Sequence, residues 1–201
     1  MRYFEESVET MPRKALEALQ IEKLCSMLEQ IYGRNRFYTD KLDAAGIHPD
    51  SIQTLDDLKR LPLTEKSELV QAQSDALPFG SNTTFEESAY SRFHQTSGTT
   101  GTPLRVLDTP ESWDWWGRCW GHVLAGAGLT ENDRMFVPFS FGPFIGFWAA
   151  VEGAQKINAL MIPGGGRDSL QRLHLMKELG ATVMCCTPTY ALRLAEVAQE
   201  S

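Results

Sequence analysis

The sequence predicts an α/β fold, in which an N-terminal helical segment precedes a β-hairpin with a glycine-rich loop and an incomplete parallel β/α/β sheet. Three observations support this fold class. Apolar residues recur at helical spacing over much of the first 75 residues, and a run rich in Ser, Thr and Gly then lies between two strand-like segments. From residue 134 onward, short apolar runs alternate with helix-like segments, which is typical of a parallel sheet with helical crossovers.

Length and composition indicate a globular protein and argue against several classes of partner. The chain has 201 residues, of which 42% are hydrophobic and 22% charged, as in an ordinary globular protein. Its net charge is −7 and basic residues form no cluster, so we expect neither nucleic acid nor an anionic membrane surface as a partner. No signal segment opens the chain, and no apolar run approaches the roughly 20 residues of a membrane span. The cysteine spacing favours free thiols in a reducing cytoplasm, and the scattered histidines predict no metal site.

The first 75 residues carry no chemical motif and are predicted to form a helical cap. Pro12 suits a first helical turn, Gly33 suits a helix end, and Thr54 suits an N-terminal cap. We therefore expect residues 1–75 to be an N-terminal helical cap and residues 76–201 to be the first part of an α/β domain. The expected helices cover residues 12–33 and 35–45, a shorter piece from residue 54, and a fourth from residue 64.

A run without any apolar side chain spans residues 94–103, between strand-like residues 89–94 and 103–108. It cannot form a core, but its hydroxyls and backbone N–H groups can converge on one ligand that is rich in acceptors. Gly98 and Gly101 permit positive φ and close approach of a ligand, and successive amides in such a turn form a nest that attracts phosphate. Because the run joins two strands and lacks the lysine of a GxxxxGK[ST] loop, we do not expect a P-loop kinase or GTPase.

After a helix over residues 109–128, strands and helices alternate to the end of the chain. Ligands of parallel sheets bind beyond the carboxyl ends of the strands, which directs attention to residues 138–144, 163–166 and 187–190. The chain stops in a helix while the sheet is still open, so we expect a truncated protein. The expected strands cover residues 134–138, 159–162 and 182–186, and the expected helices cover residues 143–156, 169–179 and 187 to the end.

Five segments together resemble a known family. Thr96-Ser97-Gly98-Thr99-Thr100-Gly101, followed by Pro103, resembles the phosphate-loop motif of the adenylate-forming superfamily, which includes acyl-CoA synthetases, luciferases and adenylation domains. The remaining four resemble phenylacetate–CoA ligases in order and spacing. They are Leu-Pro-Leu-Thr-Glu-Lys at residues 61–66, the Phe- and Gly-rich residues 139–146, Ile-Pro-Gly-Gly-Gly at residues 162–166, and Cys-Thr-Pro-Thr-Tyr-Ala at residues 186–191.

The resemblance implies the N-terminal part of an ATP-dependent aryl-acid–CoA ligase. Such an enzyme joins a carboxylate to ATP with release of pyrophosphate, and CoA then displaces AMP from the acyl-adenylate. The implied partners are ATP, Mg²⁺, CoA and a small aryl carboxylic acid, and homodimers are common in the family. The catalytic lysine and the C-terminal lid domain of family members fall beyond this chain, so no catalytic residue is assigned. We expect the 201 residues alone to be inactive.

The resemblance also assigns binding roles. In the loop, hydroxyls and glycine amides would hold the ATP phosphates and stabilise the departing pyrophosphate, whereas a plain Ser/Thr/Gly surface turn is the alternative. Thr102 stands where the family usually has lysine, which removes a cation near the pyrophosphate. At the strand ends, three phenylalanines are either pocket walls for an apolar acid or core aromatics. The nucleotide-binding residues are Thr96, Ser97, Gly98, Thr99, Thr100, Gly101 and Thr102; the acid-binding residues are Phe139, Phe141, Gly142, Phe144, Gly164, Gly165 and Gly166.

Two other functions stay open at the level of sequence. An adenylating enzyme could pass its acyl group to a carrier protein or an amine in place of CoA, because the first half-reaction is the same. Alternatively, a short protein could bind nucleotide without catalysis. A product assay in which CoA is exchanged for a carrier protein or an amine separates that adenylating enzyme from a CoA ligase. Whether the reading frame continues beyond Ser201 discriminates between a truncated ligase and a short nucleotide-binding protein.

Overall fold

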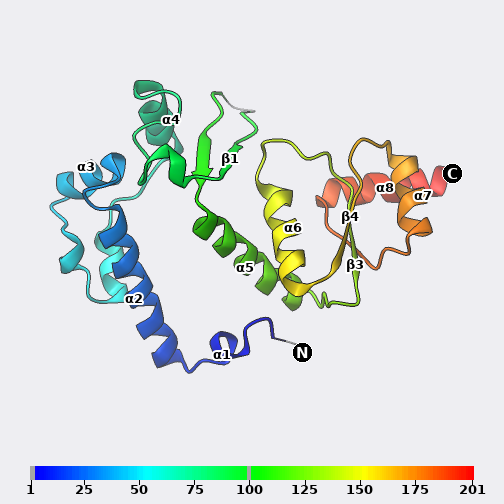
Figure 1. Cartoon of the computed structure of the whole chain (residues 1–201), viewed down its shortest axis with the longest axis horizontal. Helices are drawn as coiled ribbons and strands as arrows, with labels where there is room; N and C mark the ends of the chain where they lie inside the picture. The colour runs from blue at the N-terminus through cyan, green and yellow to red at the C-terminus, as the bar shows by residue number, and fades with distance from the viewer. Residues whose placement is uncertain (1–2, 99–100) are drawn as a thin grey trace. The chain divides into compact units, whose positions relative to one another are not determined.

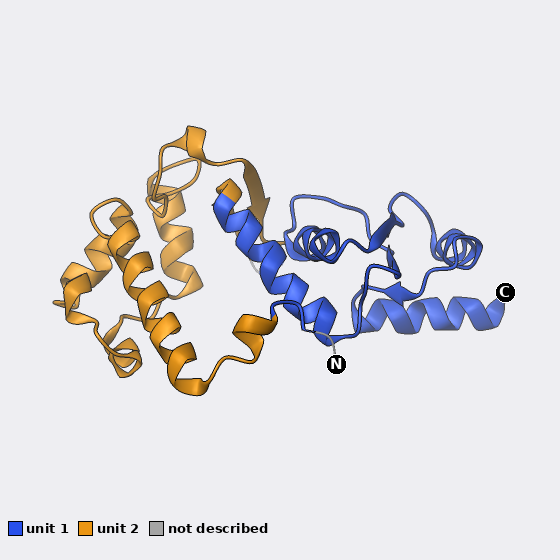
Figure 2. Cartoon of the chain, turned by 60° about the horizontal axis from the view of Figure 1, so that its bottom comes forward, with its two compact units in different colours: residues 1–5, 111–201 blue, residues 6–110 orange. Residues whose placement is uncertain are grey.

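The computed structural model describes residues 3–98 and 101–201. The chain forms two compact units (Figure 2): the hairpin unit of residues 6–110, and the sheet unit of residues 1–5 and 111–201. Each unit has a hydrophobic core of its own. The strand pair that carries the glycine-rich loop belongs to the hairpin unit, together with the N-terminal helices. The expected boundary between a helical cap of residues 1–75 and an α/β domain that begins at residue 76 stays a prediction.

The hairpin unit begins with helices, as its apolar spacing predicts. The expected helices near residues 12–33 and 35–45 are confirmed, and the piece after Thr54 is a 3-10 helix that a Thr54–Asp57 capping box opens. Leu28, Leu42, Ile47 and Ile52 are buried together and form the core of this unit. The helices are α1 (Glu6–Glu9), α2 (Arg13–Ile31), α3 (Arg36–Ala44) and α4 (Lys66–Asp75), with 3-10 helices η1 (Pro49–Ser51), η2 (Leu55–Arg60) and η3 (Glu87–Ala89) (Figure 1).

The predicted hairpin is confirmed. Strand β1 (Arg92–Gln95) pairs antiparallel with β2 (Arg105–Asp108), and His94 lies opposite Val106. The pair forms a two-stranded sheet, and residues 96–104 connect the strands. An isolated two-stranded hairpin is only marginally stable. Packing against the rest of the unit therefore has to hold the stem of the loop, which is formed by β1, β2 and the residues next to them, in place.

The sheet unit contains a three-stranded parallel sheet in the order β4-β3-β5, which confirms the predicted alternation. Helices α6 and α7 lie on opposite sides of β3 and β4 (Figure 1), and α7 packs against α8. The last strand is shorter than the predicted residues 182–186, since Cys185 and Cys186 lie beyond it. The elements are α5 (Pro110–Gly126), β3 (Arg134–Val137), α6 (Gly146–Ile157), β4 (Leu160–Pro163), α7 (Ser169–Glu178), β5 (Val183–Met184) and α8 (Pro188–Glu200).

The central strand β3 is the core of the sheet unit. Met135, Phe136 and Val137 are each 0% exposed, because helices and neighbouring strands cover both faces of the strand. Trp113 of α5 is buried, and its indole N–H donates to Glu152 Oε2 at 2.9 Å, which joins α5 to α6. None of the helices in residues 3–98 and 101–201 combines the length and apolar character needed to cross a bilayer.

A carboxylate ties together the starts of β3 and β5. Asp133 accepts hydrogen bonds from the Thr182 hydroxyl at 2.7 Å, the Thr130 amide at 2.8 Å and the Thr130 hydroxyl at 2.9 Å. Since all three bonds favour the ionised form, they hold the pKa of Asp133 below its usual value, with the Thr182 bond contributing most. The network fixes the amino-terminal edge of the sheet, opposite the edge where ligands are expected.

Replacement of Phe136 tests the core. Phe136→Ala is expected to lower the free energy of unfolding by about 3–5 kcal/mol, because it removes a fully buried ring and leaves a cavity. All five tryptophans lie between residues 113 and 148, so urea unfolding followed by tryptophan fluorescence reports on the sheet unit. Leu192→Ala, at a position that is 67% exposed, is the control and should change little. Equal effects of the two substitutions would contradict a core centred on β3.

Acid titration tests the Asp133 network. A carboxyl pKa that is lower in the folded than in the unfolded chain adds stability at neutral pH, and this stability is lost as the pH falls through the folded-state pKa. We therefore expect the unfolding free energy of the sheet unit to decrease as the pH is lowered from about 4. In the Asp133→Asn variant this free energy should depend less steeply on pH. Urea titrations at pH 6 and pH 3.5 measure the difference, with exposed Glu178→Gln as the control. Parallel pH curves for wild type and Asp133→Asn would refute the prediction.

Candidate functional site

Reciprocal hydrogen bonds close the base of the glycine-rich loop. The Thr96 amide donates to Leu104 O at 3.0 Å, and the Leu104 amide donates to Thr96 Oγ1 at 3.0 Å. The hydroxyl oxygen of Thr96 therefore acts as an acceptor inside the protein, which leaves the hydroxyl proton available for donation to a ligand. This arrangement is compatible with the phosphate-binding role predicted for Thr96.

Glycine is required at one corner of this loop. Gly98 has φ +68°, and a Cβ at this position would lie 2.8 Å from Pro103 Cγ and 3.1 Å from Gly101 O. Gly101, with φ +148°, donates its amide to Gly98 O at 3.1 Å and so forms part of the turn itself. Ser97 and Thr102 are exposed. The predicted ligand residues Thr99 and Thr100 lie outside the described residues.

A buried histidine supports the stem below the loop. His94 is 5% exposed, and its Nδ1 lies 3.4 Å from Asp108 Oδ2, which is also buried. The sequence favours a histidine satisfied by a neighbour over one that contacts nucleotide, and this contact agrees with that interpretation. His94 thus belongs to the support of the loop in the hairpin unit.

The carboxyl ends of β3 and β4 meet in the sheet unit, as expected for a parallel sheet. The Gly164 amide donates to Val137 O at 2.8 Å, and the Gly166 amide approaches Ser140 Oγ at 3.4 Å. A Cβ at Gly164 would lie 2.6 Å from Phe136 Cζ, so only glycine allows this close approach. The glycine turn at residues 164–166 therefore packs directly against the segment that follows β3.

The aromatic side chains after β3 do not share one environment. Phe139 and Phe141 pack against the core of the sheet unit, with their ring centroids 6.1 Å apart at an interplanar angle of 89°. The Trp148 indole N–H donates to Gly142 O at 2.8 Å and holds this segment to α6. Phe144 is 44% exposed. The structure brings residues 139–142 and 164–166 to one edge of the sheet, while their roles in acid binding stay predictions.

Comparison with known proteins identifies relatives over nearly the whole chain. Phenylacetate–coenzyme A ligase of Escherichia coli (strain K12) is 33% identical over 189 residues, which are 94% of this chain and 42% of that enzyme. The chain is homologous to phenylacetate–CoA ligases. The enzyme of the same name from Thermus thermophilus is 33% identical over 193 residues, or 96% of this chain. The chain spans less than half the length of these relatives, and no family model matches it.

Solved structures of CoA ligases have the same fold. A 2-hydroxyisobutyryl-CoA ligase in complex with 2-HIB-AMP and CoA superposes with a TM-score of 0.92 and 28% identity, covering 100% of this chain and 43% of that protein. An open conformation of the same ligase also superposes with a TM-score of 0.92, at 26% identity. The predicted α/β fold of an adenylate-forming enzyme is thereby confirmed.

A side-chain cluster that sequence analysis missed holds the glycine turn of the sheet unit. Arg172 of α7 donates from Nε to Gly164 O at 2.9 Å and from Nη1 to the Tyr190 hydroxyl at 2.6 Å. Its guanidinium also lies 5.3 Å from the centre of the Tyr190 ring. The Ser169 hydroxyl is 3.0 Å from the same Tyr190 oxygen. Tyr190 falls in a segment that resembles the ligases, whereas nothing near Arg172 in the sequence indicates this role.

Two adjacent thiols follow β5. Burial raises the pKa of both Cys185 and Cys186, so both favour the protonated form, which is a poor nucleophile. All four cysteines are free, and among the described residues no three His, Cys, Asp or Glu side chains gather to hold a metal ion. Cys185 and Cys186 are therefore poor candidates for covalent catalysis.

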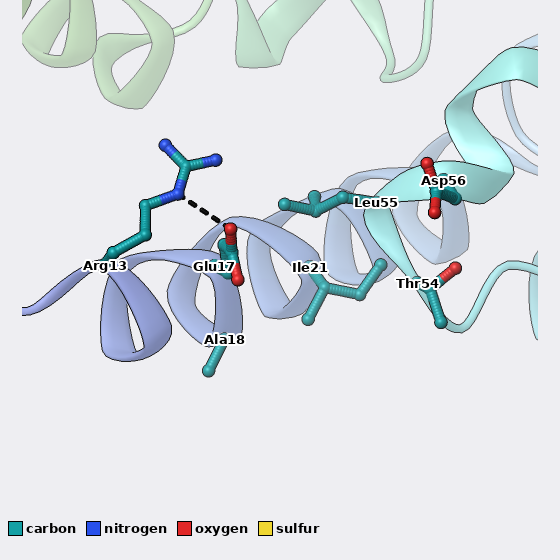
Figure 3. A pocket seen from close by; sticks show the side chains of 7 residues that line it. All are labelled: Arg13, Glu17, Ala18, Ile21, Thr54, Leu55 and Asp56. Atoms are coloured by element: carbon teal, nitrogen blue, oxygen red, sulfur yellow. Dashed lines mark hydrogen bonds and ion pairs between the residues drawn. The ribbon is translucent and has the colours of Figure 1, made fainter.

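A surface pocket lies apart from the predicted site residues of the hairpin unit. It has a volume of about 480 Å³ and is formed by α2 and the start of η2 (Figure 3). At one end, Arg13 Nε pairs with Glu17 Oε1 at 2.7 Å. The pocket is lined by Arg13, Glu17, Ala18, Ile21, Thr54, Leu55 and Asp56. It contains none of the residues assigned to nucleotide or acid binding.

Removal of the Tyr190 hydroxyl tests the cluster around Arg172. Tyr190→Phe is expected to lower the unfolding free energy of the sheet unit by about 1–3 kcal/mol, because it deletes a hydrogen bond to a charged group. Exposed Tyr3→Phe, in the same unit, is the matched control. Urea unfolding followed by tryptophan fluorescence measures both variants. If Tyr190→Phe is as stable as the control, the Tyr190 hydroxyl does not support the turn.

Proposed function

We propose that this chain is part of an ATP-dependent acid–CoA ligase, which activates an aryl carboxylate such as phenylacetate and transfers it to CoA. The observation that carries the proposal is its homology to phenylacetate–CoA ligases over 94–96% of its length. The loop between β1 and β2 and the strand ends of the sheet unit support it. The chain covers 42% of these enzymes, so the proposed activity is that of the whole protein.

The proposed reaction has two steps. A carboxylate oxygen attacks the α-phosphorus of ATP, the bond from phosphorus to the bridging oxygen breaks, and pyrophosphate leaves. The CoA sulfur then attacks the acyl carbon, the bond to AMP breaks, and the thiol proton is released to solvent or a base. In the first step negative charge moves onto the leaving pyrophosphate. Preorganised donors such as the Thr96 hydroxyl stabilise charge that develops in this way.

We propose that Mg²⁺ enters with the triphosphate. Magnesium in such enzymes is held largely by substrate phosphates and water, with only one or two carboxylates from the protein. The free state of all four cysteines supports a reducing compartment, the cytoplasm, as the location. A homodimer is a further proposal, which sedimentation velocity would test.

The preferred acid is proposed to be aromatic. Phe139 and Phe141 lie in the segment after β3 that contacts the glycine turn, and the curated relatives are named for phenylacetate. The solved ligases of the same fold are named for 2-hydroxyisobutyrate, a small branched acid. Aryl and small branched acids therefore belong in the same substrate panel. A carrier protein or an amine in place of CoA is tested as an alternative acceptor.

Pyrophosphate release by the whole protein tests the function. With ATP, Mg²⁺ and phenylacetate we expect acid-dependent release of pyrophosphate, and with CoA we expect the thioester and AMP. Gly98→Ala should lower kcat/KM for ATP by about 10²-fold, because a misplaced loop loses its alignment with the leaving group. Gly46→Ala is the control, since Gly46 has a similar φ of +66° with no atom near its Cβ position. Absence of acid-dependent pyrophosphate release with every acid would overturn the proposal.

A further inference from the structure

One buried glutamine contacts the stem of the glycine-rich loop from outside the hairpin. Gln73 of α4 is 2% exposed, and both ends of its side-chain amide are used. Its Nε2 donates to Pro103 O at 3.1 Å, and its Oε1 accepts from the Arg105 amide at 2.7 Å. The side chain therefore makes the pair of bonds that the peptide group of a neighbouring strand would make.

With these bonds, residues 103–105 are hydrogen-bonded on both sides of the extended chain. Leu104 bonds to Thr96 on one side of the extended segment, while Pro103 and Arg105 bond to Gln73 on the other. Backbone groups of an extended chain point alternately to its two sides, so the two sets of bonds do not compete. Because Pro103 also packs against Gly98, a shift of this segment would move the corner of the loop.

The chain after α4 keeps Gln73 in place. A Cβ at Gly80, which has φ +85°, would lie 2.9 Å from the Gln73 Cα, so the chain folds closely over the helix there. Arg105 donates from its guanidinium to Pro78 O at 2.8 Å and fastens the same turn to β2. The amide of Gln73 is thus enclosed between α4, this turn and the strand.

The chemistry of the side chain indicates its purpose. Burial of an amide is costly unless its polar atoms are hydrogen-bonded, and an apolar residue of similar length would fill the same volume. What glutamine adds is one donor and one acceptor directed at the backbone on either side of Leu104. We infer that Gln73 is a positioning residue for nucleotide binding, which holds residues 103–105 so that residues 96–98 meet the phosphates of ATP. This inference rests on the proposed function for the identity of the ligand.

Binding of ATP to the whole protein tests the inference. Gln73→Met keeps the length and volume of the side chain and removes both hydrogen bonds. We expect a Kd for ATP that is about tenfold higher in equilibrium dialysis, equivalent to the loss of one to two ordinary hydrogen bonds. Gln71→Met is the matched control, since exposed Gln71 lies on the same helix and bonds only to Asp75 among the contacts that the structure gives for it. Its Kd should stay within about twofold of wild type.

Amide hydrogen exchange separates positioning from general loss of structure. In Gln73→Met the Arg105 amide should exchange about tenfold faster, because its acceptor is gone, whereas the Leu104 amide keeps its bond to Thr96 and should change little. If Gln73→Met does not fold, Gln73→Glu is measured in its place. Its carboxylate still accepts from Arg105 but no longer donates to Pro103 O, and it should also raise the Kd.

The outcomes are distinct. A Kd for ATP that is unchanged in the Gln73 variant overturns the inference, even where the Arg105 amide exchanges faster, because the contact would then be structural only. Absence of ATP binding by the wild-type protein overturns it as well. Absence of acid-dependent pyrophosphate release overturns the proposed function, while a Kd that rises with Gln73→Met still supports the role of Gln73 in the loop.

Discussion

The last two carbonyl groups of β3 are the constraint on which the sheet unit depends. Phe136 O accepts from the Cys185 amide at 3.0 Å, and Val137 O accepts from the Gly164 amide at 2.8 Å. Both residues are fully buried, so these carbonyl groups need partners inside the protein. The segments that follow β4 and β5 are therefore brought to the end of β3, and Arg172 and Tyr190 reinforce the same corner from the helices.

In the hairpin unit, too, backbone groups next to a candidate site are held by partners from other elements. Its loop has only two short strands below it, so partners from elsewhere in the unit complete the pairing. Gln73 takes the place of a third strand, and the His94–Asp108 pair fills the stem. In both units backbone groups set the geometry, and glycine occurs where a side chain would collide, as at Gly98 and Gly164. The conformation of each candidate site thus depends on residues that do not themselves carry the motif.

Local patterns in the sequence were sufficient for most of the fold. Apolar periodicity and glycine stops predicted α2, α3 and the alternating strands and helices, because these features depend on neighbours within a few positions. The 3-10 geometry after Thr54 and the two-residue length of β5 were missed, since tertiary packing decides them. The supporting side chains were missed for the same reason. Gln73 and Arg105 are 32 positions apart, and Arg172 and Tyr190 are 18 apart, so no short motif connects them.

The absence of lysine and arginine from residues 94–103 has a consequence for how such a loop recognises an anion. Attraction between full charges extends over a Debye length, about 8 Å at physiological ionic strength, and salt screens it. Hydroxyls and amides act through dipoles at contact distance, where few ions can intervene. In the proposed nucleotide-binding role, this loop selects a phosphate chain by the placement of its oxygens, and we expect its affinity to change less with ionic strength than that of a loop with a cation.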